Sequence, residues 1–128
     1  MNVLLALTAF TEAATGLAFI TVPALVVRLL LGAEIGGASI ALGRVAGFGL
    51  LSLGIACWPG GDPSANPGPA RAMLTYNVLA TLYLLGLGIG GGSVGPLLWP
   101  ATAFHAIASV LLAREFRSAH SAGTPRAK

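Results

Sequence analysis

Apolar residues fill four long stretches of this chain, and short segments rich in polar residues, glycine and proline separate them. Each stretch has about the 20 residues that a helix needs to cross a hydrocarbon core roughly 30 Å thick. The pattern therefore predicts four transmembrane helices, at residues 2–22, 36–58, 70–90 and 96–116.

A fifth apolar segment, at residues 23–32, is too short to cross a membrane. Pro23 stands at the favoured first position of a helix, and Gly32 stands where a helix commonly ends. Arg28 could extend its charged end toward water from such a helix, with Glu34 just beyond it. We expect a short helix that lies in the membrane interface.

Composition supports this assignment, because 55% of the residues are hydrophobic and only 9% are charged. So few charged side chains are atypical of a soluble domain of 128 residues. We predict an all-α integral membrane four-helix bundle, formed as one domain by residues 1–116 and followed by a polar, basic tail at residues 117–128. We expect this bundle to be embedded in a lipid bilayer.

The distribution of basic residues predicts the orientation, since short loops rich in lysine and arginine stay in the cytoplasm. With four spans, both termini lie on one face, and five basic residues fall on that face against Arg28 alone on the other. The five are Arg71, Arg114, Arg117, Arg126 and Lys128. We expect cytoplasmic termini in a bacterial inner membrane, and these residues act as topology determinants rather than as a nucleic-acid surface.

Polar residues inside the four spans form the candidate site. Glu12, Arg44, Tyr83 and His105 each come from a different span and share a depth of ~10 to 15 Å from the outer ends. Further polar residues on nearby helical positions support this level: Thr8, Tyr76, Asn77, Thr102 and Ser109. We predict an intramembrane polar cluster in which Glu12 neutralises Arg44.

Two interpretations of this cluster stay open. The groups border a small pocket that opens toward the outer face, with residues 23–31 as a lid, or they close on one another in a filled bundle. Glu12 and Arg44 are also explained by a buried pair that only fixes helix register. Asn77 is expected to form an interhelical hydrogen bond rather than to bind a ligand.

Several chemistries are set aside. Cys57 is the single cysteine, and His120 lies in the tail, far from His105, so no metal site is predicted. Gly86, Gly88 and Gly91 match the spacing of a dinucleotide-binding motif, but they end a predicted membrane helix instead of following a strand. These glycines indicate close helix packing and then a turn, as Gly43 and Gly47 indicate a small-residue packing patch.

The layout resembles the DoxX-like group of small bacterial membrane proteins and neighbouring uncharacterised families. The segments that carry the resemblance are "GRVAGFGLLSLGIACWP", "ARAMLTYN" and the "FH" of the fourth span. The resemblance implies a bacterial inner-membrane protein, with quinone-linked thiol or sulfur oxidation in some relatives. The lack of a cysteine pair argues against direct thiol chemistry, and no site residue is assigned from the family.

Two function classes remain. The first is a non-enzymatic membrane protein, which is either an accessory subunit of a larger complex or a binder of a hydrophobic small molecule. Its possible protein partners are another membrane protein or further copies of itself. The second is a quinone-linked redox or proton-handling component that uses Glu12, Arg44, Tyr83 and His105. The sequence requires no cofactor, and a quinone or a lipid is compatible with the cluster.

Overall fold

The computed structural model describes residues 2–60, 66–92 and 94–122, and this part of the chain is all-α. Its helices are α1 (Asn2–Thr21), α2 (Pro23–Leu31), α3 (Ala38–Ala56), α4 (Gly68–Ile89) and α5 (Leu98–Ala122). Each predicted span and the predicted short helix corresponds to one of them. α5 continues to Ala122 instead of ending at Phe116, so the first part of the predicted tail is helical. Residues 123–128, with Arg126 and Lys128, lie outside the described residues, as do residues 61–65 between the second and third predicted spans.

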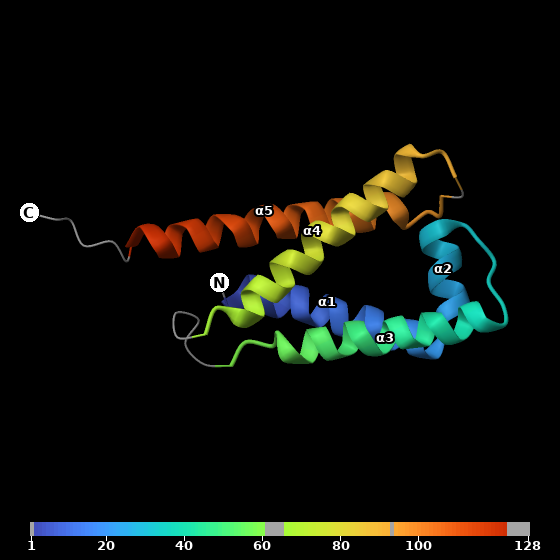
Figure 1. Cartoon of the computed structure of the whole chain (residues 1–128), viewed down its shortest axis with the longest axis horizontal. Coiled ribbons are helices and arrows are strands. Elements are labelled where there is room, and N and C mark those ends of the chain that lie inside the picture. The colour runs from blue at the N-terminus through green and yellow to red at the C-terminus, as the bar shows by residue number, and fades with distance from the viewer. Residues whose placement is uncertain (1, 61–65, 93, 123–128) are drawn as a thin grey trace, which may run out of the picture.

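The helices form two pairs, with α1 packed along α3 and α4 packed along α5 (Figure 1). Contacts between the two pairs are sparse. α2 lies across one end of the α1 and α3 pair, and α4 crosses from the level of that pair to the level of α5 (Figure 1). This arrangement leaves the inner faces of four long helices turned toward one another.

Glycine brings the backbones of α1 and α3 together. A Cβ atom added to Gly47 of α3 would lie 2.7 Å from the carbonyl oxygen of Gly16, and one added to Gly54 would lie 2.6 Å from that of Ala9. Neither position has room for a side chain, as expected where small residues let helices approach closely. The predicted packing role of Gly47 is confirmed, while Gly43 packs against the side chain of Pro23.

Backbone hydrogen bonds tie α2 to the segment before α5. The amides of Gly95 and Leu97 donate to the carbonyl oxygens of Leu30 and Leu29, at 3.2 and 2.9 Å. These bonds pair carbonyls that the end of a helix leaves without partners. A Cβ atom on Gly95 would overlap the Leu29 carbonyl, so the contact requires glycine. Gly32 ends α2 with a φ of 67°, a left-handed conformation that glycine adopts freely.

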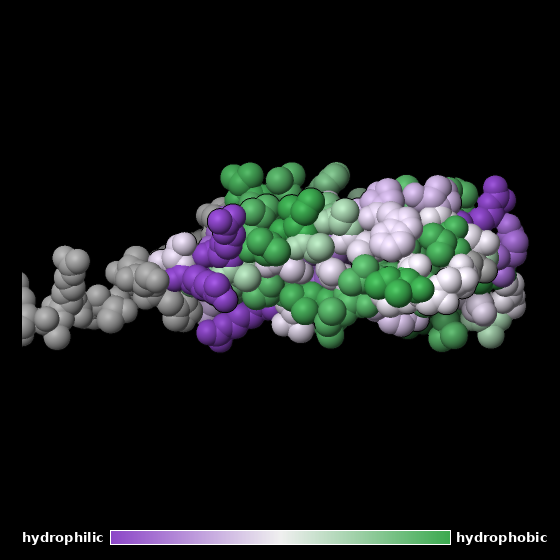
Figure 2. Space-filling model, turned by 90° about the horizontal axis from the view of Figure 1, so that it is seen from above, coloured by the Kyte–Doolittle hydropathy of each residue, from purple (hydrophilic) through white to green (hydrophobic). Residues whose placement is uncertain are grey.

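Three of the helices, α1, α3 and α4, are long and apolar enough to cross a membrane by length and composition. α5 is not among them, because its apolar stretch is interrupted at Arg114 and Glu115. Figure 2 shows hydrophilic residues gathered at the two ends of the long axis, with mainly apolar or weakly polar side chains between them. Near one of these ends, the Arg28 Nη1 atom lies 3.6 Å from the Glu34 Oε1 atom.

The contact between α1 and α3 generates the first prediction. Gly47→Ala should lower the free energy of unfolding by about 1 to 3 kcal/mol, because the new methyl group forces two backbones apart. Gly49→Ala is the matched control on the same helix, since a Cβ there meets nothing within 4 Å. Denaturation in mixed detergent micelles measures both. Equal losses would contradict the backbone contact at Gly47.

Candidate functional site

Glu12 lies on the face of α1 that the fold buries. The buried residues of α1 recur at intervals of three or four positions, which places them on one side of the helix: Leu5, Thr8, Ala9, Glu12 and Gly16. Glu12 is only 1% exposed, so its side chain is enclosed by protein atoms. A buried carboxylate is costly unless it is paired, and its neighbours therefore decide its chemistry.

The basic side chain beside Glu12 is His105 of α5, not Arg44. The His105 Nδ1 atom lies 3.8 Å from the Glu12 Oε1 atom. That oxygen is buried and has no hydrogen-bond partner. Tyr76 of α4 also interacts with the Glu12 side chain. Three helices thus bring a carboxylate, an imidazole and a phenol to one place.

Asn77 fixes the orientation of the imidazole. The Asn77 Nδ2 atom donates to the Met73 carbonyl oxygen at 2.8 Å, so the Oδ1 atom of the same amide is the group that faces α5. His105 Nδ1 lies 2.8 Å from this Oδ1 atom and must carry the proton in the bond, because an amide oxygen only accepts. In the neutral ring, Nε2 is then an unprotonated acceptor. The interhelical hydrogen bond expected of Asn77 is thus present.

Aromatic rings enclose the imidazole. The Tyr76 ring meets His105 edge to face, with centroids 5.6 Å apart and planes at 80°. Phe104 lies next to His105 on α5, with a centroid distance of 5.5 Å and an interplanar angle of 76°. These contacts restrict the ring of His105 to the position that its bond to Asn77 selects.

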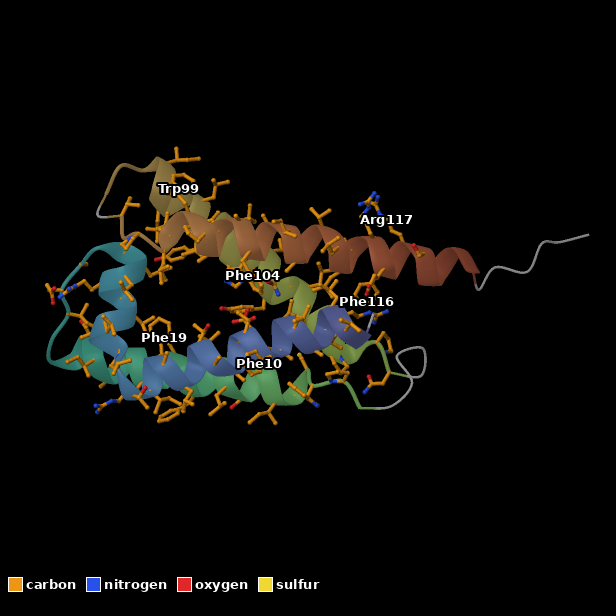
Figure 3. The ribbon with its side chains drawn as sticks, turned by 180° about the vertical axis from the view of Figure 1, so that it is seen from behind. Phe10, Phe19, Trp99, Phe104, Phe116 and Arg117 are labelled. Carbon is orange, nitrogen blue, oxygen red and sulfur yellow. The ribbon has the colours of Figure 1, made fainter. Side chains whose placement is uncertain are left out.

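The cluster borders a cavity of about 690 Å³ to which all five helices contribute. Most of its wall is apolar, and Phe19 and Phe104 both lie beside the space between the helix pairs (Figure 3). Val26, Leu30 and Leu31 of α2 close part of one end. The polar level is therefore not a filled, closed network, because Glu12, Tyr76 and His105 all line this cavity.

The predicted pairing of Glu12 with Arg44 is wrong. Arg44 is exposed, does not line the cavity and makes no ion pair within the described part of the chain. Leu53, which lines the cavity, comes about two and a half turns after Arg44, so the two side chains point to opposite sides of α3. An equal predicted depth did not imply that the two side chains face each other.

Tyr83 occupies a different position from the one predicted. It lines the cavity but is 69% exposed, and no hydrogen bond joins its hydroxyl to the cluster. Tyr76, predicted only as a supporting residue, takes the place beside Glu12. The two tyrosines lie seven positions apart, about two helical turns, so the sequence pattern gave no means to choose between them.

The other supporting residues satisfy their hydroxyl groups within their own helices. Thr8 donates to the Leu5 carbonyl at 3.0 Å, Thr102 to Leu98 at 2.7 Å and Ser109 to His105 at 2.8 Å. Such bonds leave these hydroxyls little capacity for a ligand. Within residues 2–60, 66–92 and 94–122, no group of three or more histidine, cysteine or acidic residues could hold a metal ion.

No family model, curated protein or solved structure matches this chain. The resemblance to the DoxX-like group thus stays a prediction. The function has to be inferred from the geometry of the cavity and its polar cluster.

The second prediction concerns the partner of Glu12. In a double-mutant cycle, Glu12→Gln and His105→Gln should be non-additive by about 0.5 to 3 kcal/mol, because the residues share one polar network. The matched cycle of Glu12→Gln with Arg44→Gln should be additive, because Glu12 faces the cavity whereas Arg44 lies on the side of α3 that faces away from it. Unfolding free energies in mixed micelles measure both cycles. Coupling to Arg44 alone would contradict the described geometry.

Proposed function

We propose that this chain is an integral membrane protein of four spans that binds a hydrophobic or amphipathic small molecule in its cavity. The observation that carries the proposal is a largely apolar cavity of about 690 Å³ with Glu12, Tyr76 and His105 converging on its wall. Ligand pockets have volumes of roughly 300 to 1,000 Å³ and combine apolar walls with a few placed polar groups.

The state of the polar cluster supports a binding role over a purely structural one. A network that only holds helices together gains most when every buried polar atom is paired. Here one buried oxygen of Glu12 has no partner. A ligand whose polar end reaches this oxygen would supply the missing interaction. The cavity also favours ligand binding over the accessory-subunit hypothesis, which requires no cavity, while a quinone-linked role remains a prediction.

The proposed placement is the bacterial inner membrane, with α1, α3, α4 and α5 as spans, α2 at the outer interface and both termini in the cytoplasm. The apolar outer surface between two hydrophilic ends supports this placement (Figure 2). Among the described residues, Arg71, Arg114 and Arg117 would then face the cytoplasm, in agreement with the positive-inside rule. In this arrangement the backbone N–H and C=O groups of each long helix are hydrogen-bonded within the helix, as a lipid environment requires.

Arg44 fits this placement without a protein partner. It lies six positions after Ala38, so its backbone is about 9 Å from the start of α3. Helical side chains lean toward the N-terminus of their helix, and a long arginine side chain can extend in that direction. The exposed guanidinium would thereby reach the interface and its lipid phosphates, which lowers the cost of a charge in the membrane.

Reporter fusions test the proposed topology as the third prediction. A fluorescent protein fused after Lys128 should fold and fluoresce, because it stays in the cytoplasm. Alkaline phosphatase inserted at Gly92 should be active, because the connection between α4 and α5 faces the periplasm. The reverse pattern, with active phosphatase at the C-terminus, would overturn the orientation.

The fourth prediction is that filling the cavity prevents ligand binding. Ala80 lines the cavity from α4, and Ala80→Trp should occupy that space. Adamantyl diazirine, a small apolar photoreactive probe, should label Glu12 and Tyr76 in wild-type nanodiscs, as detected by peptide mass spectrometry. We expect Ala80→Trp to reduce this labelling at least about tenfold, the equivalent of roughly 1.4 kcal/mol.

Ala72→Trp is the matched control, because Ala72 lies on α4 but is exposed and does not line the cavity. Labelling of Glu12 should stay at the wild-type level in this variant. Labelling that is unchanged in Ala80→Trp, or absent from cavity residues in the wild type, would contradict a ligand-accessible cavity.

A further inference from the structure

We propose that the cavity selects a lipophilic monocation, a ligand with one positive centre surrounded by apolar groups, and that Glu12 is the residue that recognises its charge. The proposal rests on the ligand-binding function and specifies the chemical class of the ligand. It follows from the charges, the unpaired acceptors and the aromatic rings on the cavity wall.

The charged residues on the cavity wall favour a cation. Among the residues that line the cavity, Glu12 is the single acidic one, and no lysine or arginine accompanies it. Arg44 lies on the opposite side of α3, and Arg28 pairs with Glu34 near one end of the molecule. A carboxylate without a nearby fixed cation in a low-dielectric space attracts a cation and repels an anion.

In the cluster, the N–H donor of His105 is already in a hydrogen bond, whereas two acceptor atoms have no donor among the described residues. The Nδ1–H group of His105 donates to the Asn77 Oδ1 atom, with the two atoms 2.8 Å apart. The Glu12 Oε1 atom lies 3.8 Å from Nδ1, which is too far for a hydrogen bond. The buried Oε1 atom of Glu12 therefore lacks a donor. Nε2 of the neutral His105 ring is a second acceptor without a partner in the described part of the chain. A ligand that brings positive charge matches this surplus of acceptors.

Aromatic side chains provide the remaining recognition. Tyr76 and Phe104 flank the cluster, and Phe19 and Tyr83 line the cavity further from it. The faces of such rings attract cations, and groups of aromatic residues commonly bind quaternary ammonium centres. The apolar groups around the positive centre would contact Leu50 and the other aliphatic residues of the wall.

Cation binding also implies a dependence on pH. A protonated Glu12 offers no charge, so a cation and a proton compete for this side chain. The titratable groups that face Glu12 are Tyr76 of α4 and His105 of α5, while α2 and α3 contribute none to the cavity wall. Protonation of His105 adds a like charge beside the ligand. Acidification should thus weaken binding of the cation through both residues.

Three probes of one shape test the charge selectivity. Tetraphenylphosphonium, tetraphenylmethane and tetraphenylborate place four phenyl rings around a positive, a neutral and a negative centre. Each tritiated probe is measured separately by equilibrium dialysis against protein in nanodiscs, with binding to empty nanodiscs subtracted. We expect the phosphonium to bind at least about tenfold more tightly than the neutral probe and the borate not to bind specifically.

Glu12→Gln should bring phosphonium affinity down to that of the neutral probe and leave binding of the neutral probe unchanged. Glu34→Gln makes the same chemical change outside the cavity and should preserve the wild-type affinities. If Glu12→Gln does not fold, the wild type alone decides. Its phosphonium binding should weaken as the pH falls, while binding of the neutral probe should stay constant.

The outcomes separate the two proposals. Equal binding of the neutral and cationic probes, or preference for the borate, overturns the cation site but leaves a hydrophobic binding protein. Phosphonium affinity that is unchanged in a folded Glu12→Gln protein also overturns the role of Glu12. Failure of all three probes, together with no diazirine labelling of cavity residues, overturns the ligand-binding function itself.

Discussion

The close backbone contact between α1 and α3 determines which faces of these helices remain for the cavity. Ala9 and Gly16 of α1 meet Gly54 and Gly47 of α3 without intervening side chains. On a helix with 3.6 residues per turn, Glu12 stands only a fraction of a turn from this contact face. The packing therefore turns the carboxylate toward α4 and α5, and it leaves Arg44 on the outer side of α3.

The polar cluster depends on the second helix pair in the same way. The amide of Asn77 is oriented by the Met73 carbonyl of its own helix, and it in turn selects the proton position on His105. An imidazole held in this manner loses little freedom when a ligand binds, which is the benefit of preorganisation. Since contacts between the two pairs are sparse, part of the space between them stays open as the cavity.

The cavity and the proposed membrane placement support each other physically. Helices that are apolar on most faces need a lipid environment, and in that environment a single buried carboxylate is a costly group that calls for an explanation. A filled bundle would hide Glu12 behind complementary partners, whereas here it borders an apolar space with one oxygen unpaired. The proposed ligand accounts for the unpaired oxygen and for the apolar wall together.

The sequence by itself determined the number, order and approximate limits of the helices, because hydrophobic length and the Pro23 and Gly32 boundaries act locally along the chain. It also identified Glu12 and His105 as members of one polar level, since depth follows from counting residues along a helix. Only the tertiary structure decided that Tyr76 replaces Tyr83 and that Arg44 stays outside. The position of Arg44 depends on how α3 is rotated about its axis, and the glycine contacts with α1 set that rotation. Tyr76 and Tyr83 share one side of α4, so the choice between them depends on the level at which α4 passes Glu12.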